Sequence, residues 1–121
     1  GDSAPDEQSA LPKPRLGGFL KNLLNRPKEL RPPMLKMTTS SESIVLHWSA
    51  VHAATHYVIE LTLPNGTTKS SLPRPTGKGT ELTIPKTKLA SLGVYRFQVI
   101  AIDQAADLKS EPSNVVTFQA K

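Results

Sequence analysis

Apolar and polar residues alternate in short stretches over most of the chain beyond residue 32, which is the spacing of β-strands with one buried face. The pattern predicts seven strands, at residues 34–38, 43–48, 57–63, 67–72, 81–84, 95–101 and 115–118. The inward side chains predicted from these strands include Ile44, Leu46, Trp48, Tyr57, Ile59, Tyr95, Phe97 and Val99. Seven short strands separated by turns are typical of two antiparallel sheets packed face to face. We therefore expect an all-β, antiparallel two-sheet β-sandwich over residues 32–121.

Two of the connections carry strong turn signals. Asn65-Gly66 predicts a two-residue hairpin of type I′, because both central residues of that turn need a positive φ and this pair tolerates it well. Two prolines and two glycines within residues 73–80 predict a loop. The chain should thus reverse sharply after the third strand and loosely after the fourth.

The first 31 residues follow a different pattern. Residues 1–15 are rich in proline and in small or polar residues, and such a segment buries too little apolar surface to offset its loss of conformational entropy. We expect residues 1–31 to be a flexible linker interrupted by one short amphipathic helix at about residues 18–26, because apolar residues recur there every three or four positions. The apolar face of this helix consists of Leu16, Phe19, Leu20, Leu23 and Leu24.

A helix of this length is marginal in water, so its apolar face needs a surface to pack on. Three surfaces stay open. The face could pack on the neighbouring sandwich or bind another protein, or it could lie on a membrane, for which Lys21 and Arg26 provide a thin basic side.

The strand region resembles a fibronectin type III domain over about 90 of the 121 residues. The resemblance rests on Pro32-Pro33 ahead of the first strand, Trp48 closing the second, Tyr57 opening the third, Leu89 six residues before Tyr95, and Ser110-Glu111-Pro112-Ser113 ahead of the last. It implies a seven-stranded antiparallel immunoglobulin-like β-sandwich, in which the first, second and fifth strands form one sheet and the other four form the second. Trp48 is then packed between the sheets and Leu89 lies in the core. The resemblance also implies that Tyr95 is a tyrosine-corner residue, whose hydroxyl bonds to the backbone near Leu89.

Two recognition motifs known in that family are missing. The loop between the sixth and seventh predicted strands contains no Arg-Gly-Asp, and the chain contains no Trp-Ser-x-Trp-Ser. The resemblance therefore does not extend to integrin binding or to cytokine-receptor function.

Composition narrows the chemistry. The absence of cysteine excludes disulfides, thiolate metal sites and cysteine nucleophiles. The net charge is +5, but no broad basic run is present, so we expect no nucleic-acid partner. A carbohydrate or an anionic polymer bound near Lys69, Arg74 and Lys78 stays open. No apolar run approaches the roughly 18 residues that cross a bilayer, and a lipid anchor or peripheral attachment outside this sequence also stays open.

Residues that could catalyse a reaction or bind a metal are sparse. The chain has no nucleophile elbow, phosphate loop or zinc-protease motif. His47, His52 and His56 are close in sequence, but no cysteine or closely spaced carboxylate completes a zinc shell. Asp103 and Asp107 supply too few oxygen ligands for calcium. We therefore expect a protein that is not an enzyme and that has no cofactor, metal site or catalytic residue.

These observations favour a non-catalytic protein-interaction or adhesion module, tethered by its N-terminal linker and binding an unidentified protein. The resemblance implies a place outside the cell or in a bacterial cell envelope, and the proline- and serine-rich start fits a mature lipoprotein. Two alternatives stay open. The domain could be a rigid spacer within a larger secreted multidomain protein or enzyme, or it could carry a partner-recruiting helix at residues 16–26.

Overall fold

The computed structural model of the chain describes residues 29–121. The predicted helix at residues 18–26, with its apolar face from Leu16 to Leu24, lies outside the described residues, as does most of the predicted linker. The described elements are, in order, β1 (Leu35–Thr39), β2 (Ser43–Trp48), β3 (His56–Thr62), β4 (Thr68–Ser70), β5 (Arg74–Pro75), the 3-10 turn η1 (Thr76–Lys78), β6 (Glu81–Pro85), the 3-10 turn η2 (Lys86–Lys88), β7 (Gly93–Asp103), β8 (Leu108–Lys109) and β9 (Val116–Ala120).

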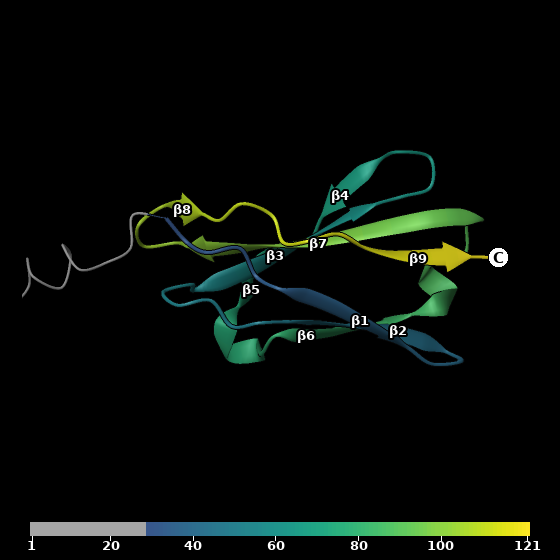
Figure 1. The fold of residues 1–121 in the computed structure, drawn as a ribbon, viewed down its shortest axis with the longest axis horizontal. Coiled ribbons are helices and arrows are strands. Elements are labelled where there is room, and N and C mark those ends of the chain that lie inside the picture. Colours follow the sequence, from purple (N-terminus) through teal and green to yellow (C-terminus); the bar gives the residue numbers. More distant parts are fainter. Residues whose placement is uncertain (1–28) are drawn as a thin grey trace, which may run out of the picture.

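These strands form two antiparallel sheets that face each other (Figure 1). One sheet has the order β1-β2-β6. In the other, β3 and β7 pair along the centre, β4 and β5 pair with β3, and β8 and β9 pair with β7. This is the division between sheets that the resemblance implied. Each predicted strand overlaps an observed one, whereas the two-residue strands β5 and β8 were not predicted.

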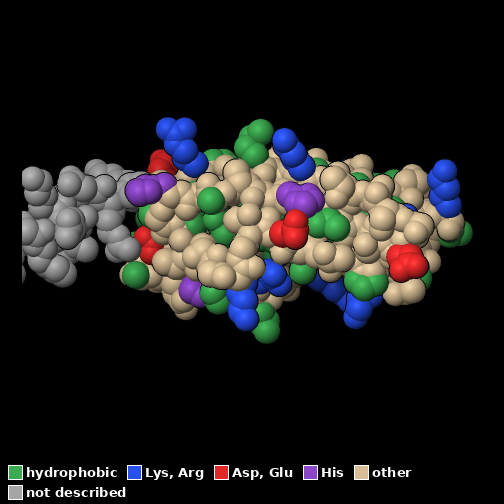
Figure 2. Space-filling view, turned by 90° about the horizontal axis from the view of Figure 1, so that it is seen from below, with side chains coloured by type: hydrophobic (Ala, Val, Ile, Leu, Met, Phe, Trp, Pro, Cys, Tyr) green, Lys and Arg blue, Asp and Glu red, His purple; other side chains and the backbone are tan. Residues whose placement is uncertain are grey.

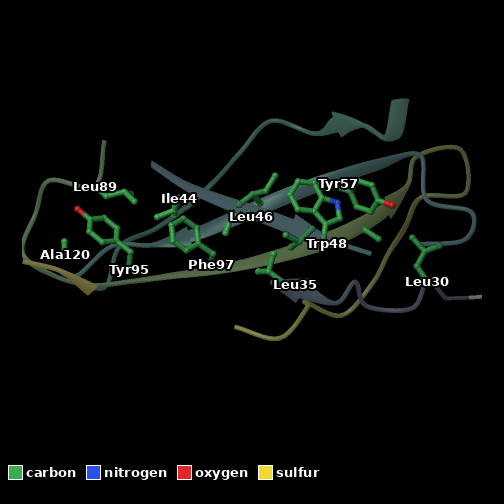
Figure 3. Packing of buried hydrophobic residues seen from close by; sticks show 13 residues of the cluster. Leu30, Leu35, Ile44, Leu46, Trp48, Tyr57, Leu89, Tyr95, Phe97 and Ala120 are labelled. Atoms are coloured by element: carbon green, nitrogen blue, oxygen red, sulfur yellow. The ribbon is translucent and has the colours of Figure 1, made fainter. Parts of the chain in front are cut away.

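The core lies between the two sheets and contains thirteen buried apolar side chains (Figure 3). Those predicted from the sequence are all among them, namely Ile44, Leu46, Trp48, Tyr57, Ile59, Leu89, Tyr95, Phe97 and Val99. The sheet register explains this, because residues directly opposite each other in two strands point to the same face. Ile59 is paired with Val99 across β3 and β7, and Tyr57 with Ala101.

The core extends further toward the N-terminus than the predicted domain boundary. Leu30 is only 4% exposed and belongs to the buried cluster. The predicted linker runs through residue 31, so Leu30 lies within that stretch and still contributes to the core. The sequence pattern missed Leu30 because it stands alone, without the alternating neighbours that identify a strand.

The turn after β3 also differs from the prediction. Asn65 does not have the positive φ that a type I′ turn requires, whereas Gly66 has a φ of 91°. The Gly66 N–H donates to the Leu63 carbonyl at 2.8 Å, and the Leu63 N–H donates to the Thr67 carbonyl at 2.8 Å. The loop therefore spans residues 64–66, because the fixed φ of Pro64 favours a type I turn that the glycine completes. The predicted hairpin is present, but the predicted turn type is wrong.

The Tyr95 ring is buried, and its hydroxyl accepts a hydrogen bond from the Ser91 N–H at 2.9 Å. The resemblance implied such a bond near Leu89, and it falls two residues further along the chain. The bond fixes the connection that leads from η2 into β7.

Two buried serines hold the chain between β8 and β9. The Ser110 hydroxyl oxygen accepts from the Ala101 N–H, and the Ser113 hydroxyl oxygen accepts from the Val99 N–H, each at 2.9 Å. Both serines also donate their own N–H groups to the carbonyls of the same two β7 residues, at 2.8 Å. Residues 110–113 thus continue along the edge of β7 and place Pro112, which has no N–H to contribute, at the surface.

Candidate functional site

A groove of about 600 Å³ opens at the end of the sandwich where the described chain begins. Its walls come from three stretches that are far apart in sequence: residues 31–34 ahead of β1, residues 49–52 after β2, and Pro112 with Asn114 ahead of β9. We name it the proline groove, because Pro32, Pro33 and Pro112 line it. The Met34 residue on its wall is 66% exposed.

The wall that carries Met34 is held by two hydrogen bonds to Ser49, which belongs to the second wall. The Met34 N–H donates to the Ser49 hydroxyl at 2.8 Å, and the Ser49 N–H donates to the Met34 carbonyl at 3.0 Å. These bonds extend the pairing of β1 with β2 beyond its last register pair, Leu35 with Trp48. The backbone polar groups of Met34 are therefore satisfied within the domain.

Asn114 joins the third wall to the first. Its Oδ1 accepts from the Leu35 N–H at 2.8 Å, and its Nδ2 donates to the Leu35 carbonyl at 2.9 Å. One side-chain amide thus takes the place of a neighbouring strand at the outer edge of β1. Because Asn114 precedes β9 in the other sheet, this pair of bonds also ties the two sheets together at the groove.

The second wall is the loop after β2, and it is held by Tyr57. The Val51 N–H donates to the Tyr57 hydroxyl at 3.0 Å, while the buried Tyr57 ring packs edge-on against Trp48 with ring centroids 5.7 Å apart. The loop turns at Ala53, which has a φ of 71°, and the Ala54 N–H donates to the Val51 carbonyl at 3.1 Å. Each wall of the groove is therefore anchored to the core or to the other sheet.

The chemistry of the proline groove suits an apolar side chain. Proline, methionine, alanine and valine make up most of its lining, while Arg31, His52 and Asn114 add a few polar groups. A concave, mostly apolar site with few polar groups is the usual form of a binding pocket. Sequence reasoning missed it, because its residues show no periodicity and come together only through the fold.

The histidines considered for zinc are dispersed by the fold. His47 Nδ1 lies 3.0 Å from Glu81 Oε2, and His47 Nε2 lies 3.3 Å from Thr38 Oγ1. His56 Nδ1 lies 2.9 Å from Thr55 Oγ1. Within the described part of the chain, no three histidine, cysteine or acidic side chains gather as a metal site would require.

The two aspartates considered for calcium have different surroundings. Asp103 is only 1% exposed, and its Oδ1 accepts from the Ala106 N–H at 3.2 Å, which closes the loop between β7 and β8. Asp107 is exposed in the same loop and has a φ of 55°. The Asp103 carboxylate therefore helps to shape the loop that carries Asp107.

The basic residues considered for an anionic polymer lie on three elements. Lys69 is in β4, Arg74 in β5 and Lys78 in η1. The Arg74 Nη2 is directed to the Glu81 carbonyl at 3.5 Å, and the residue is half-buried. On the face seen in Figure 2, basic and acidic side chains are spread along the length of the sandwich.

No helix among the described residues is long and apolar enough to cross a membrane. No family model matches the chain, and no curated protein matches it.

Solved structures do match. An Fn3-like protein from Clostridium thermocellum is 20% identical with a TM-score of 0.53, and the match covers 77% of this chain and 92% of that protein. An FN3 domain of human collagen XX is 22% identical with a TM-score of 0.52, over 73% of this chain and 91% of that domain. The described residues therefore have the fibronectin type III fold.

A larger protein also matches. A β-1,2-glucanase from Parabacteroides distasonis is 20% identical with a TM-score of 0.59, and the match covers 77% of this chain. It covers only 13% of the glucanase, so this chain spans a small part of that protein's length. The same fold thus occurs as one module of a larger protein.

Proposed function

We propose that the chain is a non-catalytic protein-interaction module that acts outside the cell or in a cell envelope, and that its contact surface is the proline groove. The groove itself supports this proposal, because it is open to solvent, mostly apolar and anchored on every wall. Met34 adds to the argument, since a methionine that is 66% exposed gains from being covered by a partner, and methionine is enriched in interface cores. The extracellular placement rests on the resemblance of the sequence to fibronectin type III domains.

A substitution pair tests this function. Met34→Asp places a charge on the groove wall, whereas Leu92→Asp makes a comparable change at a residue 73% exposed in the loop before β7. Both residues are exposed, so we expect each variant to keep its free energy of unfolding within about 0.5 kcal/mol of the wild type.

The purified proteins are then immobilised and exposed to the envelope and secreted fractions of the organism from which the gene comes. We expect the wild type and Leu92→Asp to retain the same protein, and Met34→Asp to lose it. Equal retention by all three proteins would show that the groove is not the contact surface.

A second function, that of a rigid spacer, is favoured by the path of the chain. The described chain begins at one end of the sandwich and its C-terminus lies at the other (Figure 1). The long strand β7 has 11 residues, which corresponds to roughly 36 Å at the usual rise of an extended strand. A domain connected in this way holds its two neighbours at a fixed separation.

A domain swap separates the two functions. Residues 29–121 are replaced, in the full-length protein, by an unrelated fibronectin type III domain of the same length. A spacer keeps the activity of the whole protein after the swap, whereas an interaction module loses it.

A further inference from the structure

We propose that residues 16–24 of this chain pack their apolar face into the proline groove, so that an outside protein has to displace them. The packing is independent of the proposed function, whereas the competition with an outside protein rests on it. The inference rests on two observations. The groove has apolar walls that are open to solvent, and the predicted helix has an apolar face that has to pack on some surface.

The chain reaches the groove easily. Arg31, the wall residue nearest to the described N-terminal end, is two peptide steps from Glu29, which limits their separation to roughly 7 Å. Five steps separate Leu24 from Glu29, and these can span up to roughly 17 Å. The link is thus long enough for the segment to fold back onto the groove and too short for it to move far away.

The direction of the chain at Leu30 favours the same conclusion. Leu30 is buried, and Figure 3 shows it at the Tyr57 end of the core, away from Leu89 and Ala120. The described chain therefore enters the sandwich at the end where the groove lies.

The tether also favours this segment over a free protein as the first occupant. A link of a few residues holds its end at an effective concentration of about millimolar, so even weak apolar packing fills the groove most of the time. The segment offers five large apolar side chains, Leu16, Phe19, Leu20, Leu23 and Leu24, within nine residues. A helix of nine residues is unstable alone, so packing in the groove would also stabilise it.

Paramagnetic relaxation in the whole chain tests the packing. The chain has no cysteine, so Asn22→Cys creates a single attachment point for a nitroxide spin label, on the side of the predicted helix away from its leucines. We expect the label to broaden the NMR signals of Met34 and Val51 in the groove and to leave those of Asn65 and Leu92, at the other end, unchanged. Equal broadening at both ends, or none at Met34, would overturn the proposal.

Two further variants of the labelled chain show whether the leucines cause the packing. Leu20→Gln with Leu23→Gln removes apolar contacts and is expected to weaken the broadening at Met34 and Val51 severalfold, to the level that a tethered but unpacked label produces. Lys21→Gln with Arg26→Gln changes the same number of residues outside the apolar face and is expected to preserve it. Broadening of unchanged strength after the leucine changes would contradict packing through that face.

A mixing experiment distinguishes this chain's own segment from that of a second copy. Spin-labelled chains without nitrogen-15 are mixed with unlabelled chains that contain nitrogen-15. We expect no broadening in the mixture, and broadening at Met34 would assign the groove to a second copy instead.

The competition has its own readout. If residues 16–24 occupy the groove, the double leucine variant should retain several-fold more of any protein whose retention depends on Met34. Unchanged retention would overturn the competition and leave the packing intact. Absence of the relaxation effect would overturn the packing, while the comparison of Met34→Asp with Leu92→Asp would still decide the proposed function.

Discussion

Replacing Asn114 by alanine should destabilise the domain more than most substitutions of exposed residues do. The change removes both hydrogen bonds between the Asn114 side chain and the Leu35 backbone, which have lengths of 2.8 and 2.9 Å. Each such bond contributes about 0.5–1.5 kcal/mol, so the expected loss is about 1–3 kcal/mol. Water replaces the lost partner poorly, because both bonds are partly buried and the Leu35 side chain is only 3% exposed.

Urea denaturation followed by tryptophan fluorescence measures this loss, since Trp48 is the only tryptophan and is buried. With an m-value of about 1–3 kcal/mol/M, the midpoint should fall by roughly 1 M without a change in slope. Asn65→Ala is the matched control, because the Asn65 Oδ1 accepts one exposed, local hydrogen bond from the Thr67 N–H at 2.9 Å. We expect the control to stay within about 0.5 kcal/mol of the wild type. Equal midpoints for the two variants would refute the bridging role of Asn114.

Three further substitutions test the packing of the sandwich. Trp48→Ala should cost roughly 3–5 kcal/mol and leave most of the chain unfolded at room temperature, which far-UV circular dichroism would detect. Tyr95→Phe keeps the ring but removes the acceptor for the Ser91 N–H, so we expect a loss of about 0.5–1.5 kcal/mol and faster hydrogen exchange at the Ser91 amide. Gly93→Ala places a Cβ 2.8 Å from the Pro64 Cβ at a φ of 120°, and thermal denaturation should show a loss of at least about 2 kcal/mol.

The alternation of apolar residues predicted most of the fold, because a strand with one buried face has an apolar residue at every second position. Strand β2 was predicted with its observed limits, from Ser43 to Trp48. Strand β7 was predicted at residues 95–101 but begins at Gly93 and ends at Asp103, since neither end residue fits the apolar pattern.

The departures from the prediction have local causes. The turn after β3 was assigned from its Asn-Gly pair, but the preceding Pro64 determined the turn type through its fixed φ. Leu30 is buried by tertiary packing alone, so no neighbouring residue marked it as part of the core.

The proline groove could not be predicted from the sequence. Its three walls are separated by many residues, and two of them are fixed by the side chains of Ser49 and Asn114. Serine and asparagine in a loop usually indicate a turn or an exposed position. Only the fold reveals that Asn114 bonds to the β1 backbone and that Ser49 bonds to Met34, just before β1. A site built from such contacts has no local sequence signature.

Site-specific photocrosslinking tests most directly whether the proline groove is a contact surface. A benzophenone amino acid is placed at Met34 in one protein and at Leu92 in another, each is expressed in the organism from which the gene comes, and the crosslinked peptides are identified by mass spectrometry. We predict that position 34 crosslinks to residues 16–24 of its own chain and to one discrete protein, and that position 92 crosslinks to neither. If position 34 yields no more crosslinks than position 92, the groove is ordinary surface and the proposed function is wrong.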